Sequence, residues 1–353
     1  MIRNIINKAI LFARNRCNNF ILPTLILLNL LSIQQALAGS IEQKISGDTH
    51  NKKVLISQVI EHKALDSTTK GIIDALENAG FKRDVNIDIR IESAQGSPAL
   101  ASQIASKFVS QNPDVVVGVG TISAQSFVKY AADRKVKLVF SSITDPLAAN
   151  LVQNLDKPGN NTSGVSNFVD LEPQIKLFKR LQPKLKRLGI LYNPGEINSV
   201  SIVRKLEKLC GQFNLNLVKQ IATKTADVPQ AATKLVNQSD AIFISNDNTA
   251  LSALQSIIRA ANNVAVPVYV SDTDAVELGA LAALGPNQYQ LGLQTGKIIL
   301  RSFKGEDLGK MPVEFPDKTD LYINLEAAAI ANVSIPENIR KEATKSIEKS
   351  SGS

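Results

Sequence analysis

The sequence predicts an α/β protein made of two doubly wound parallel-sheet lobes joined by a multi-strand hinge. From residue 53 to about 333, short apolar runs rich in β-branched residues alternate with stretches whose apolar residues recur at helical spacing. A strand that ends in a polar loop and opens a helix occurs twice, at 115–124 and 241–250, about half the mature sequence apart. About 280 residues in this alternation favour two lobes over a single core.

The strands are expected as continuous apolar runs, which are typical of parallel strands covered by helices on both faces. The stretches between them carry apolar stripes of helical period, such as Ile72, Ile73 and Leu76, and Gly80 stands where that helix would end. The predicted strands lie at 54–60, 85–91, 115–119, 136–140, 188–192, 215–220, 241–245 and 266–270.

The boundary between the lobes is expected at 158–164, a segment rich in Gly and Asn that interrupts the first series, and 189–194 begins the second. A strand at 280–284 returns the chain to the first lobe, where a helix spans 289–303, and 321–324 crosses once more. Several crossings make this junction a hinge. The predicted lobes are 53–164 with 285–312 (N-terminal) and 165–284 with 313–335 (C-terminal).

Residues 1–38 have the organisation of a Sec-type signal peptide. Basic residues without acidic ones precede an apolar stretch at 20–31, and Ala36-Leu-Ala38 is a cleavage site. The apolar stretch is shorter than the ~20 residues that cross a bilayer. We therefore expect cleavage after Ala38 and a periplasmic protein, and no lipoprotein because Gly39, rather than a cysteine, stands directly after the site. Residues 39–52 are predicted to be a flexible linker and 336–353 a mobile charged tail.

The composition excludes several classes of function. The signal removes four positive charges from the formal +8 and leaves about +4 (8 − 4). Without tryptophan or a basic stripe, no nucleic-acid partner is expected. The mature chain keeps one cysteine, Cys210, on a helical apolar stripe, which predicts a buried thiol and no disulfide. Because no zinc spacing, Walker loop, nucleophile elbow or activated cysteine is present, we predict no metal, cofactor or enzymatic activity.

The first of the two polar strand exits offers a candidate carboxylate site. Gly118 and Gly120 allow the backbone to approach a ligand, and Thr121, Ser123 and Ala124 follow at a helix start whose N–H groups suit an anion. In open α/β sheets, ligands bind beyond the carboxyl ends of the strands. Helix capping by Ser123 explains the pattern equally well, and both interpretations remain open.

A second polar exit follows the next predicted strand. Ser141, Ser142, Thr144 and Asp145 place three hydroxyl groups and one carboxylate within five positions, which is more than a turn needs. Asp145 before Pro146 is also a common turn starter. We predict that this loop contacts the ligand.

Across the predicted cleft, the second lobe presents carboxylates and amides that suit an ammonium group. Asn246, Asp247 and Asn248 follow one strand, and Asp272 follows the next. Because a buried carboxylate is costly without a cation, either Asp247 or Asp272 is the candidate anchor of an amine. Alternatively, one of the two asparagines caps the helix that follows them.

Two further strand ends add residues to the rim of the cleft. Ser57 and Gln58 end the first strand, and Asn198 follows a Pro/Gly turn in the second lobe. His62 is the only histidine between the signal-proximal linker and the C-terminus. With no second histidine or cysteine cluster beside it, a contact at the rim is favoured over a metal ligand.

Short motifs in a fixed order are spread over most of the body. They lie at 56–62, 64–66, 94–96, 118–121, 144–146, 191–196, 198–199, 246–248 and 271–274. These motifs resemble those of the ABC transporter substrate-binding protein family, in particular its tryptophan and aromatic amino acid-binding members. The resemblance covers about 54–327 and departs from the family pattern at Lys63, 167–170 and 285–289. It implies a type I periplasmic-binding-protein fold, an aromatic or other apolar amino acid as ligand, and delivery to a membrane permease with its ATPase.

These observations predict a monomeric periplasmic receptor whose lobes close on a small amino acid-like ligand. Thr121, Ser123 and Ser142 are expected to hold the carboxylate, and Asp247 or Asp272 the ammonium group. Two alternatives remain open: a receptor that presents its ligand to a sensor or chemoreceptor, and a secreted hydrolase or racemase. Neighbouring permease and ATPase genes would favour transport, and product formation would indicate an enzyme.

Overall fold

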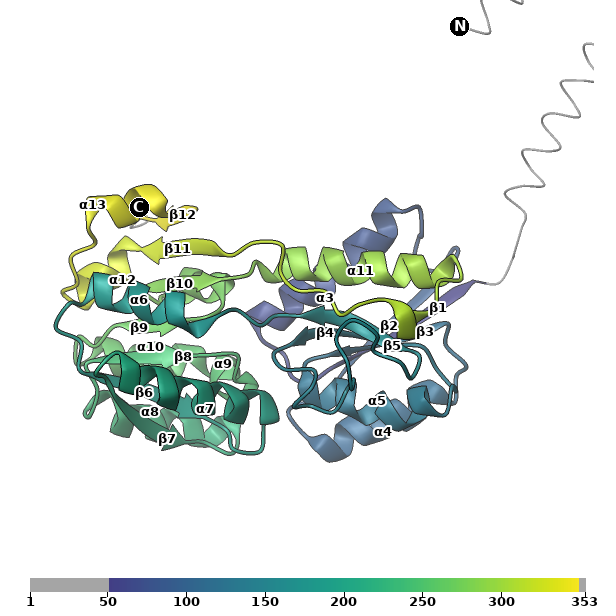
Figure 1. The fold of residues 1–353 in the computed structure, drawn as a ribbon, viewed down its shortest axis with the longest axis horizontal. Coiled ribbons are helices and arrows are strands. Elements are labelled where there is room, and N and C mark those ends of the chain that lie inside the picture. Colours follow the sequence, from purple (N-terminus) through teal and green to yellow (C-terminus); the bar gives the residue numbers. More distant parts are fainter. Residues whose placement is uncertain (1–50, 349–353) are drawn as a thin grey trace, which may run out of the picture. The chain divides into compact units, whose positions relative to one another are not determined.

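The computed structural model describes residues 51–348, which form two α/β lobes, each built on its own sheet (Figure 1). The expected signal peptide and nearly all of the expected linker lie outside the described residues. Between residues 51 and 348, no helix has the length and apolar character needed to cross a membrane.

The first lobe contains a five-stranded sheet of order β2-β1-β3-β4-β5 in which all neighbours are parallel. Its elements are β1 (Lys52–Gln58), α3 (Lys63–Asn78), β2 (Ile87–Ser93), α4 (Pro98–Val109), β3 (Val115–Val119), α5 (Thr121–Ala132), β4 (Leu138–Ile143), β5 (Thr162–Ser166), α11 (Gln288–Phe303) and the 3-10 turn η3 (Leu308–Lys310). α3 and α11 cover one face, and α4 and α5 cover the other (Figure 1). Strand side chains alternate between these layers: Val54 and Ile56 pack under α3, and Leu55 packs on α4.

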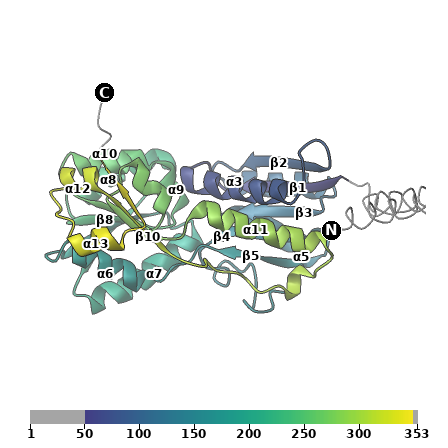
Figure 2. The ribbon, with the colours of Figure 1, turned by 90° about the horizontal axis from the view of Figure 1, so that it is seen from above.

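The second lobe contains a seven-stranded sheet of order β12-β11-β10-β9-β8-β6-β7. Its elements are α6 (Leu171–Leu181), β6 (Arg187–Tyr192), α7 (Ile197–Gln212), β7 (Asn216–Ile221), η1 (Thr225–Asp227), α8 (Val228–Val236), β8 (Ala241–Ile244), α9 (Asn248–Ser252), α10 (Leu254–Asn262), β9 (Val268–Val270), η2 (Thr273–Leu278), β10 (Ala282–Gly285), β11 (Asp320–Asn324), α12 (Leu325–Ile330), α13 (Glu337–Glu342) and β12 (Lys345–Ile347). One face packs on α6, α7, α12 and α13, and the other packs on α8 and α10 (Figure 2). All neighbouring strands are parallel except β10 and β11. The thiol of Cys210 in α7 is buried in the first of these layers, as predicted.

Three chain segments connect the two lobes. The chain passes from β5 to α6, from β10 to α11, and from η3 to β11. Two of these segments run side by side, because Ser166 N–H donates to the carbonyl of Glu314 at 2.8 Å and Glu314 N–H donates to the carbonyl of Gly164 at 2.9 Å. The predicted fold class, two α/β lobes joined by a multi-strand hinge, is therefore confirmed.

β5 is a strand that the sequence does not predict. It begins inside the segment that we interpreted as the interruption between the lobes, and all five of its residues, Thr162–Ser166, are buried. Only Val165 among them has a large apolar side chain, so no apolar run marks the strand. The chain leaves the first sheet after Ser166 rather than at 164.

The expectation of a mobile C-terminal tail is wrong for residues 337–347. Ile339 of α13 is completely buried, and β12 extends the second sheet by pairing with β11. The guanidinium of Arg180 donates two hydrogen bonds of 2.7 Å to Glu342. One apolar anchor and one added strand therefore hold a segment whose composition is mostly polar and charged.

Replacing Ile339 by alanine is expected to lower the free energy of unfolding by about 3 kcal/mol, because a fully buried side chain is lost and a cavity remains. Urea unfolding of the purified protein measures this change. Lys341→Ala on the exposed side of α13 is the matched control and should stay within about 0.5 kcal/mol of the parent protein. Equal stability of the two variants would show that α13 is not part of the core.

Candidate functional site

A small enclosed cavity lies between the two lobes, where the carboxyl ends of their strands face each other. Its volume is about 10 Å³, which is room for about one water molecule. The side chains of the two lobes therefore nearly fill it. The lining residues are His62, Ala64, Leu65, Thr121, Ser142 and Gln288 from the first lobe, Asn167 from the first hinge segment, and Asn198, Asn246, Asn248, Leu251 and Asp272 from the second lobe.

Thr121 reaches the cavity at the first residue of α5. Gly120 before it has a φ of +85°, and a Cβ there would lie 2.4 Å from Cγ1 of Val59, so only glycine suits this turn. The N–H groups of the first helical turn have no acceptor within the helix. The start of α5 thus brings hydrogen-bond donors to the first-lobe wall of the cavity.

Ser142 and Gln288 complete this wall. Ser142 adopts a φ of +56°, a left-handed conformation that is uncommon for serine and is found most often at functional positions. Its hydroxyl lies 3.0 Å from Oγ1 of Thr68, and both hydroxyls donate to Oε1 of Gln288 at 3.2 Å. Because Oε1 is already an acceptor for these groups, the amide nitrogen of Gln288 remains as a donor.

Asp272 is the carboxylate in the second-lobe wall. The side chain is 3% exposed, and Oδ1 accepts a hydrogen bond of 3.1 Å from Asp274 N–H. Burial, together with the charge of Asp274, raises the pKa of Asp272 to about 8, although that hydrogen bond and Lys63 act in the opposite direction. A cation in the cavity would stabilise the ionised form of this group.

Asn198 and Asn248 add acceptors to the same wall. Oδ1 of Asn198 is buried and has no hydrogen-bond partner among residues 51–348. Oδ1 of Asn248 lies 3.4 Å from Nε2 of His62, a contact between the lobes. Burial lowers the pKa of the imidazole, and Asn248, Asp66 and Glu196 only partly oppose the shift, so His62 is neutral at neutral pH. The first lobe therefore presents mainly hydrogen-bond donors to the cavity, and the second lobe presents mainly hydrogen-bond acceptors.

Asp247 is not placed to anchor an amine, which corrects one of the two alternatives for that role. Oδ1 accepts from Ala250 N–H at 2.7 Å, and Oδ2 accepts from Asn193 N–H at 2.6 Å and from the Ser199 hydroxyl. It does not line the cavity. Burial and the charge of Glu196 raise the pKa of Asp247 to about 7. This carboxylate caps α9 and ties it to the turn after β6.

Four other predicted site residues support the first-lobe wall from behind. Ser57 donates to Ser123 at 3.1 Å, and Ser141 lies 2.7 Å from Oγ1 of Thr295. Ala124 packs in the apolar cluster with Phe140. None of these side chains lines the cavity. The cap predicted for Ser123 is wrong, because its hydroxyl bonds to Ser57 and no described side chain caps α5.

Thr144 and Asp145 link the two lobes outside the cavity. Oγ1 of Thr144 donates to Oδ1 of Asn167 at 3.2 Å and accepts from Nδ2 of Asn246 at 3.4 Å. Asp145 accepts from the Ser201 hydroxyl at 2.8 Å and pairs with Lys205 at 3.7 Å. The loop after β4 therefore contacts the second lobe directly, and these contacts require the lobes to be close together.

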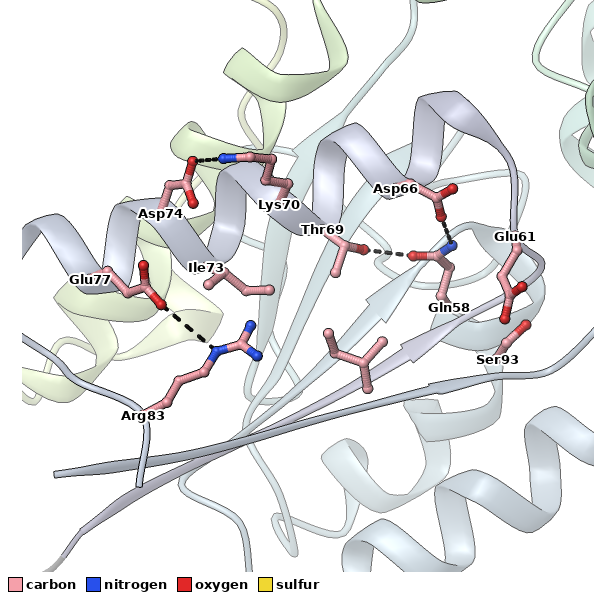
Figure 3. Close-up of a pocket in the computed structure, with 11 residues that line it drawn as sticks. Gln58, Glu61, Asp66, Thr69, Lys70, Ile73, Asp74, Glu77, Arg83 and Ser93 are labelled. Carbon is pink, nitrogen blue, oxygen red and sulfur yellow. Dashed lines mark hydrogen bonds and ion pairs between the residues drawn. The ribbon is translucent and has the colours of Figure 1, made fainter. Parts of the chain in front are cut away.

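Gln58 lies in a different hollow, an open groove of about 530 Å³ on the first lobe between α3 and β2. Figure 3 shows its amide between Asp66 and Thr69, with hydrogen bonds of 2.8 and 2.7 Å. The basic residues of the groove pair within it, Lys70 with Asp74 and Arg83 with Glu77. Although this groove is larger, its amide and its basic side chains already have partners, so the cavity between the lobes is the better candidate for a ligand site. Gln58 does not line that cavity, and its contact with the ligand stays a prediction.

Several lining residues are not among those predicted from the sequence. Asn167 and Gln288 follow β5 and β10, so the rule that placed the other candidates at strand ends applies to them too. Asn167 is missed because the sequence does not predict β5. Gln288 is missed because the predicted strand at 280–284 is expected only to carry the chain back to the first lobe. Ala64, Leu65 and Leu251 belong to helix starts whose apolar residues cannot be distinguished from core residues by sequence.

Two α/β lobes that enclose a polar cavity beside a three-segment hinge define a solute-binding protein of the type I periplasmic-binding-protein fold. The chain belongs to the ABC transporter substrate-binding protein family: the family model described as ABC transporter substrate binding protein matches residues 53–347. The resemblance noted in the motifs is confirmed. This is a family of extracytoplasmic solute-binding proteins, rather than enzymes, whose members work with ABC transporter components.

Individual relatives support the same family. The chain is 34% identical to the Tyrosine-binding protein of Clostridioides difficile (strain R20291) over 286 residues, which are 81% of this chain and 82% of the relative. It also resembles the solved ABC domain from Streptococcus pneumonia in complex with L-Trp, with a TM-score of 0.80 and 32% identity over 84% of this chain and 100% of that one.

A third comparison bears on the arrangement of the lobes. The ligand-free, open structure of a substrate-binding protein with adhesive properties from Clostridium difficile matches with a TM-score of 0.63 and 34% identity, over 84% of this chain and 100% of the other. The sequence identity to this open structure is nearly the same as the identity to the L-Trp complex, but the TM-score is lower.

Proposed function

We propose that this protein is the extracytoplasmic binding component of an ABC importer and that it captures an aromatic amino acid between its lobes. The observation that carries the proposal is the polarity of the cavity, with donors on the first lobe and acceptors on the second. An amino acid zwitterion carries a carboxylate, which accepts hydrogen bonds, and an ammonium group, which donates them, on the same carbon. It can therefore bridge the donors of the first lobe and the acceptors of the second. The relatives that bind tyrosine and L-Trp support an amino acid with an aromatic side chain.

The carboxylate of the ligand is assigned to the first lobe. Thr121 offers a hydroxyl donor, Gln288 offers its amide nitrogen, and the start of α5 offers backbone N–H groups. No arginine or lysine of the described residues lines the cavity, so this carboxylate would be held by neutral donors. Such donors are effective where water is excluded.

The ammonium group is assigned to the second lobe. Asp272 supplies the negative charge, and the amide oxygens of Asn198 and Asn248 supply neutral acceptors. Charge-assisted hydrogen bonds of this kind are about twice as strong as neutral ones. The buried Oδ1 of Asn198, which has no partner among residues 51–348, is available to accept a hydrogen bond from the ligand.

The ligand side chain would contact Ala64, Leu65 and Leu251, the apolar residues of the lining. Because the cavity holds about one water molecule, an aromatic amino acid requires the lobes or these side chains to move apart. The contacts of Asp145 with Ser201 and of His62 with Asn248 would then form as the lobes close over the ligand. Closure thereby couples ligand capture to the shape that a membrane permease recognises.

A thermal-unfolding screen tests the ligand assignment. Purified protein is heated with L-tyrosine, L-tryptophan, L-phenylalanine, L-leucine or a pentose. A ligand at 100 times its Kd adds about 2.7 kcal/mol of stability, so Tm should rise on the order of 5 °C with an aromatic amino acid. A rise with the pentose alone would contradict the assignment. Ligand recovered unchanged after incubation excludes hydrolysis or racemisation, and stimulation of ATP hydrolysis by a reconstituted permease and ATPase tests the importer role.

A further inference from the structure

Glu196 is a buried carboxylate that lies behind the acceptor wall of the cavity. It precedes α7, is 2% exposed, and does not line the cavity itself. Oε1 accepts from the backbone N–H of Thr249 at 2.9 Å and from its hydroxyl at 2.7 Å. Oε2 accepts from the backbone N–H of Asn248 at 3.0 Å. These bonds join α7 to the start of α9.

Glu196 also contacts the side chains of two of the asparagines that line the cavity, Asn198 and Asn248. Nδ2 of Asn248 donates to Oε2 of Glu196 at 2.6 Å, and Nδ2 of Asn198 donates to the same oxygen at 3.2 Å. Nδ2 of Asn198 also donates to the carbonyl of Asn246 at 2.8 Å. Each asparagine therefore directs its NH₂ group toward a fixed acceptor.

The chemistry of a carboxylate determines which way these amides point. An ionised carboxylate can only accept hydrogen bonds, whereas an asparagine side chain has a donor end and an acceptor end. With its NH₂ group held by Glu196, each asparagine must present its oxygen elsewhere. The oxygen of Asn248 meets His62, and that of Asn198 is buried without a partner in the part of the chain that the structure describes.

We infer that Glu196 is a positioning residue that makes the site selective for ligands with an amino group, by holding Asn198 and Asn248 with their oxygens toward the cavity. The inference rests on the proposed function, since it concerns the amine end of the proposed ligand. An ammonium group carries three donors, enough for Asp272 and both amide oxygens. A 2-hydroxy acid of the same shape carries one donor and would leave acceptors unsatisfied, which is costly in a buried site.

Glu196→Gln tests this role because it preserves size and replaces one acceptor by a donor. The introduced amide can still accept from Thr249, but its NH₂ group then faces two other NH₂ groups, so the asparagine amides are expected to turn. Titration calorimetry compares L-tryptophan with indole-3-lactate, and L-tyrosine with 4-hydroxyphenyllactate. The unchanged protein should prefer the amino acid by about 100-fold or more, and the variant should lose about 10-fold or more of that preference.

Two further variants separate positioning from general structural support. Thr249→Ala removes the hydroxyl that bonds to Oε1 and leaves both asparagine contacts intact. It should lower stability but keep the preference for the amino acid. The pair Glu196→Gln with Asn248→Asp exchanges the donor and acceptor across one hydrogen bond and should restore part of the preference, even if Glu196→Gln alone folds poorly.

The outcomes distinguish the inference from the function on which it rests. If the unchanged protein binds neither amino acid, or prefers the hydroxy acids, the proposed function fails and the inference fails with it. If the unchanged protein prefers the amino acids and Glu196→Gln keeps the full preference, the function stands and the inference is wrong. An equal loss of preference in Thr249→Ala and Glu196→Gln would also overturn it, because general loosening of α9 would explain both.

Discussion

Replacing Asp272 by asparagine is expected to weaken binding of an aromatic amino acid by about 100-fold or more, a loss of about 2.7 kcal/mol in binding free energy. The carboxylate is buried in the cavity wall and is the proposed partner of the ammonium group. Removing one member of a buried charge pair costs roughly 2–5 kcal/mol because the other charge is left without its partner. Titration calorimetry measures the change directly.

The ligand-free Asp272→Asn protein provides the control for this prediction. Burial raises the pKa of Asp272 from 3.8 to about 8, so the native state binds more protons than the unfolded state between these values. The native protein without ligand should therefore lose stability as pH rises through that range. The Asp272→Asn substitution removes this dependence of stability on pH. Near pH 8, the variant should be at least as stable as the parent protein. Loss of binding together with loss of stability would instead indicate misfolding.

Ligand affinity should depend on pH for the same reason. An ammonium group favours the ionised form of Asp272, so binding releases a proton wherever the empty site is protonated. Affinity should then fall as pH is lowered below about 8, by up to about tenfold per pH unit. Burial is the main cause of the raised pKa of Asp272, the charge of Asp274 adds to it, and Lys63 opposes it. Protonation of His62, which also lines the cavity, would repel the ammonium group at lower pH and so act in the same direction. A flat affinity profile between pH 5 and 8 in the unchanged protein would contradict the assignment of Asp272.

Replacing Gly292 by alanine is expected to lower the free energy of unfolding by about 3 kcal/mol. α11 crosses α3 at Gly71 and Gly292, where no side chain separates the two backbones. A Cβ at Gly292 would lie 2.1 Å from the carbonyl oxygen of Thr68, and one at Gly71 would lie 2.2 Å from that of Tyr289. The helices would have to move apart, which would also displace Thr68 and Gln288 of the cavity network.

Whether Gly292→Ala lowers or raises the free energy of unfolding distinguishes the effect of close helix packing from that of helix propensity. Alanine in a helix is more favourable than glycine by about 1 kcal/mol when nothing else changes. Gly211→Ala in α7 is the matched control, because a Cβ there meets nothing within 4 Å, and it should leave stability unchanged or raise it. Urea unfolding of both variants makes the comparison. If Gly292→Ala is as stable as Gly211→Ala, the two helices do not pack as closely as described.

Much of the fold could be predicted because its signals are local. The run of valines at β3 and the stripe of Ile72, Ile73 and Leu76 in α3 have the periods of a buried strand and a packed helix. β5 escaped prediction because Thr162–Ser166 contains little apolar surface, although its neighbours bury all of it. The tail at 337–347 escaped because a single residue, Ile339, anchors a charged segment.

The candidate site was predictable only to the level of which strand ends contribute to it. Thr121, Ser142, Asn198 and Asp272 follow predicted strands and line the cavity. Ser57, Ser123 and Ser141 also lie at or near the ends of strands, but their hydroxyls bond to partners within the first lobe. Position at a strand end places a residue near the cleft, whereas the direction of its side chain depends on neighbours from other segments.

The sequence by itself determined the two α/β lobes, the polar strand ends between them and the family, because these depend on periodicity and on short motifs. The tertiary structure alone decided between Asp247 and Asp272. Both follow strands of the second lobe and are chemically identical, but Asn193 and Ser199, far away in the sequence, occupy Oδ2 of Asp247, and Ala250 N–H occupies Oδ1. Asp272 keeps acceptor capacity at the cavity because the hydrogen bond to its Oδ1 comes from its near neighbour, Asp274. Which carboxylate lines the cavity is a consequence of these long-range hydrogen bonds.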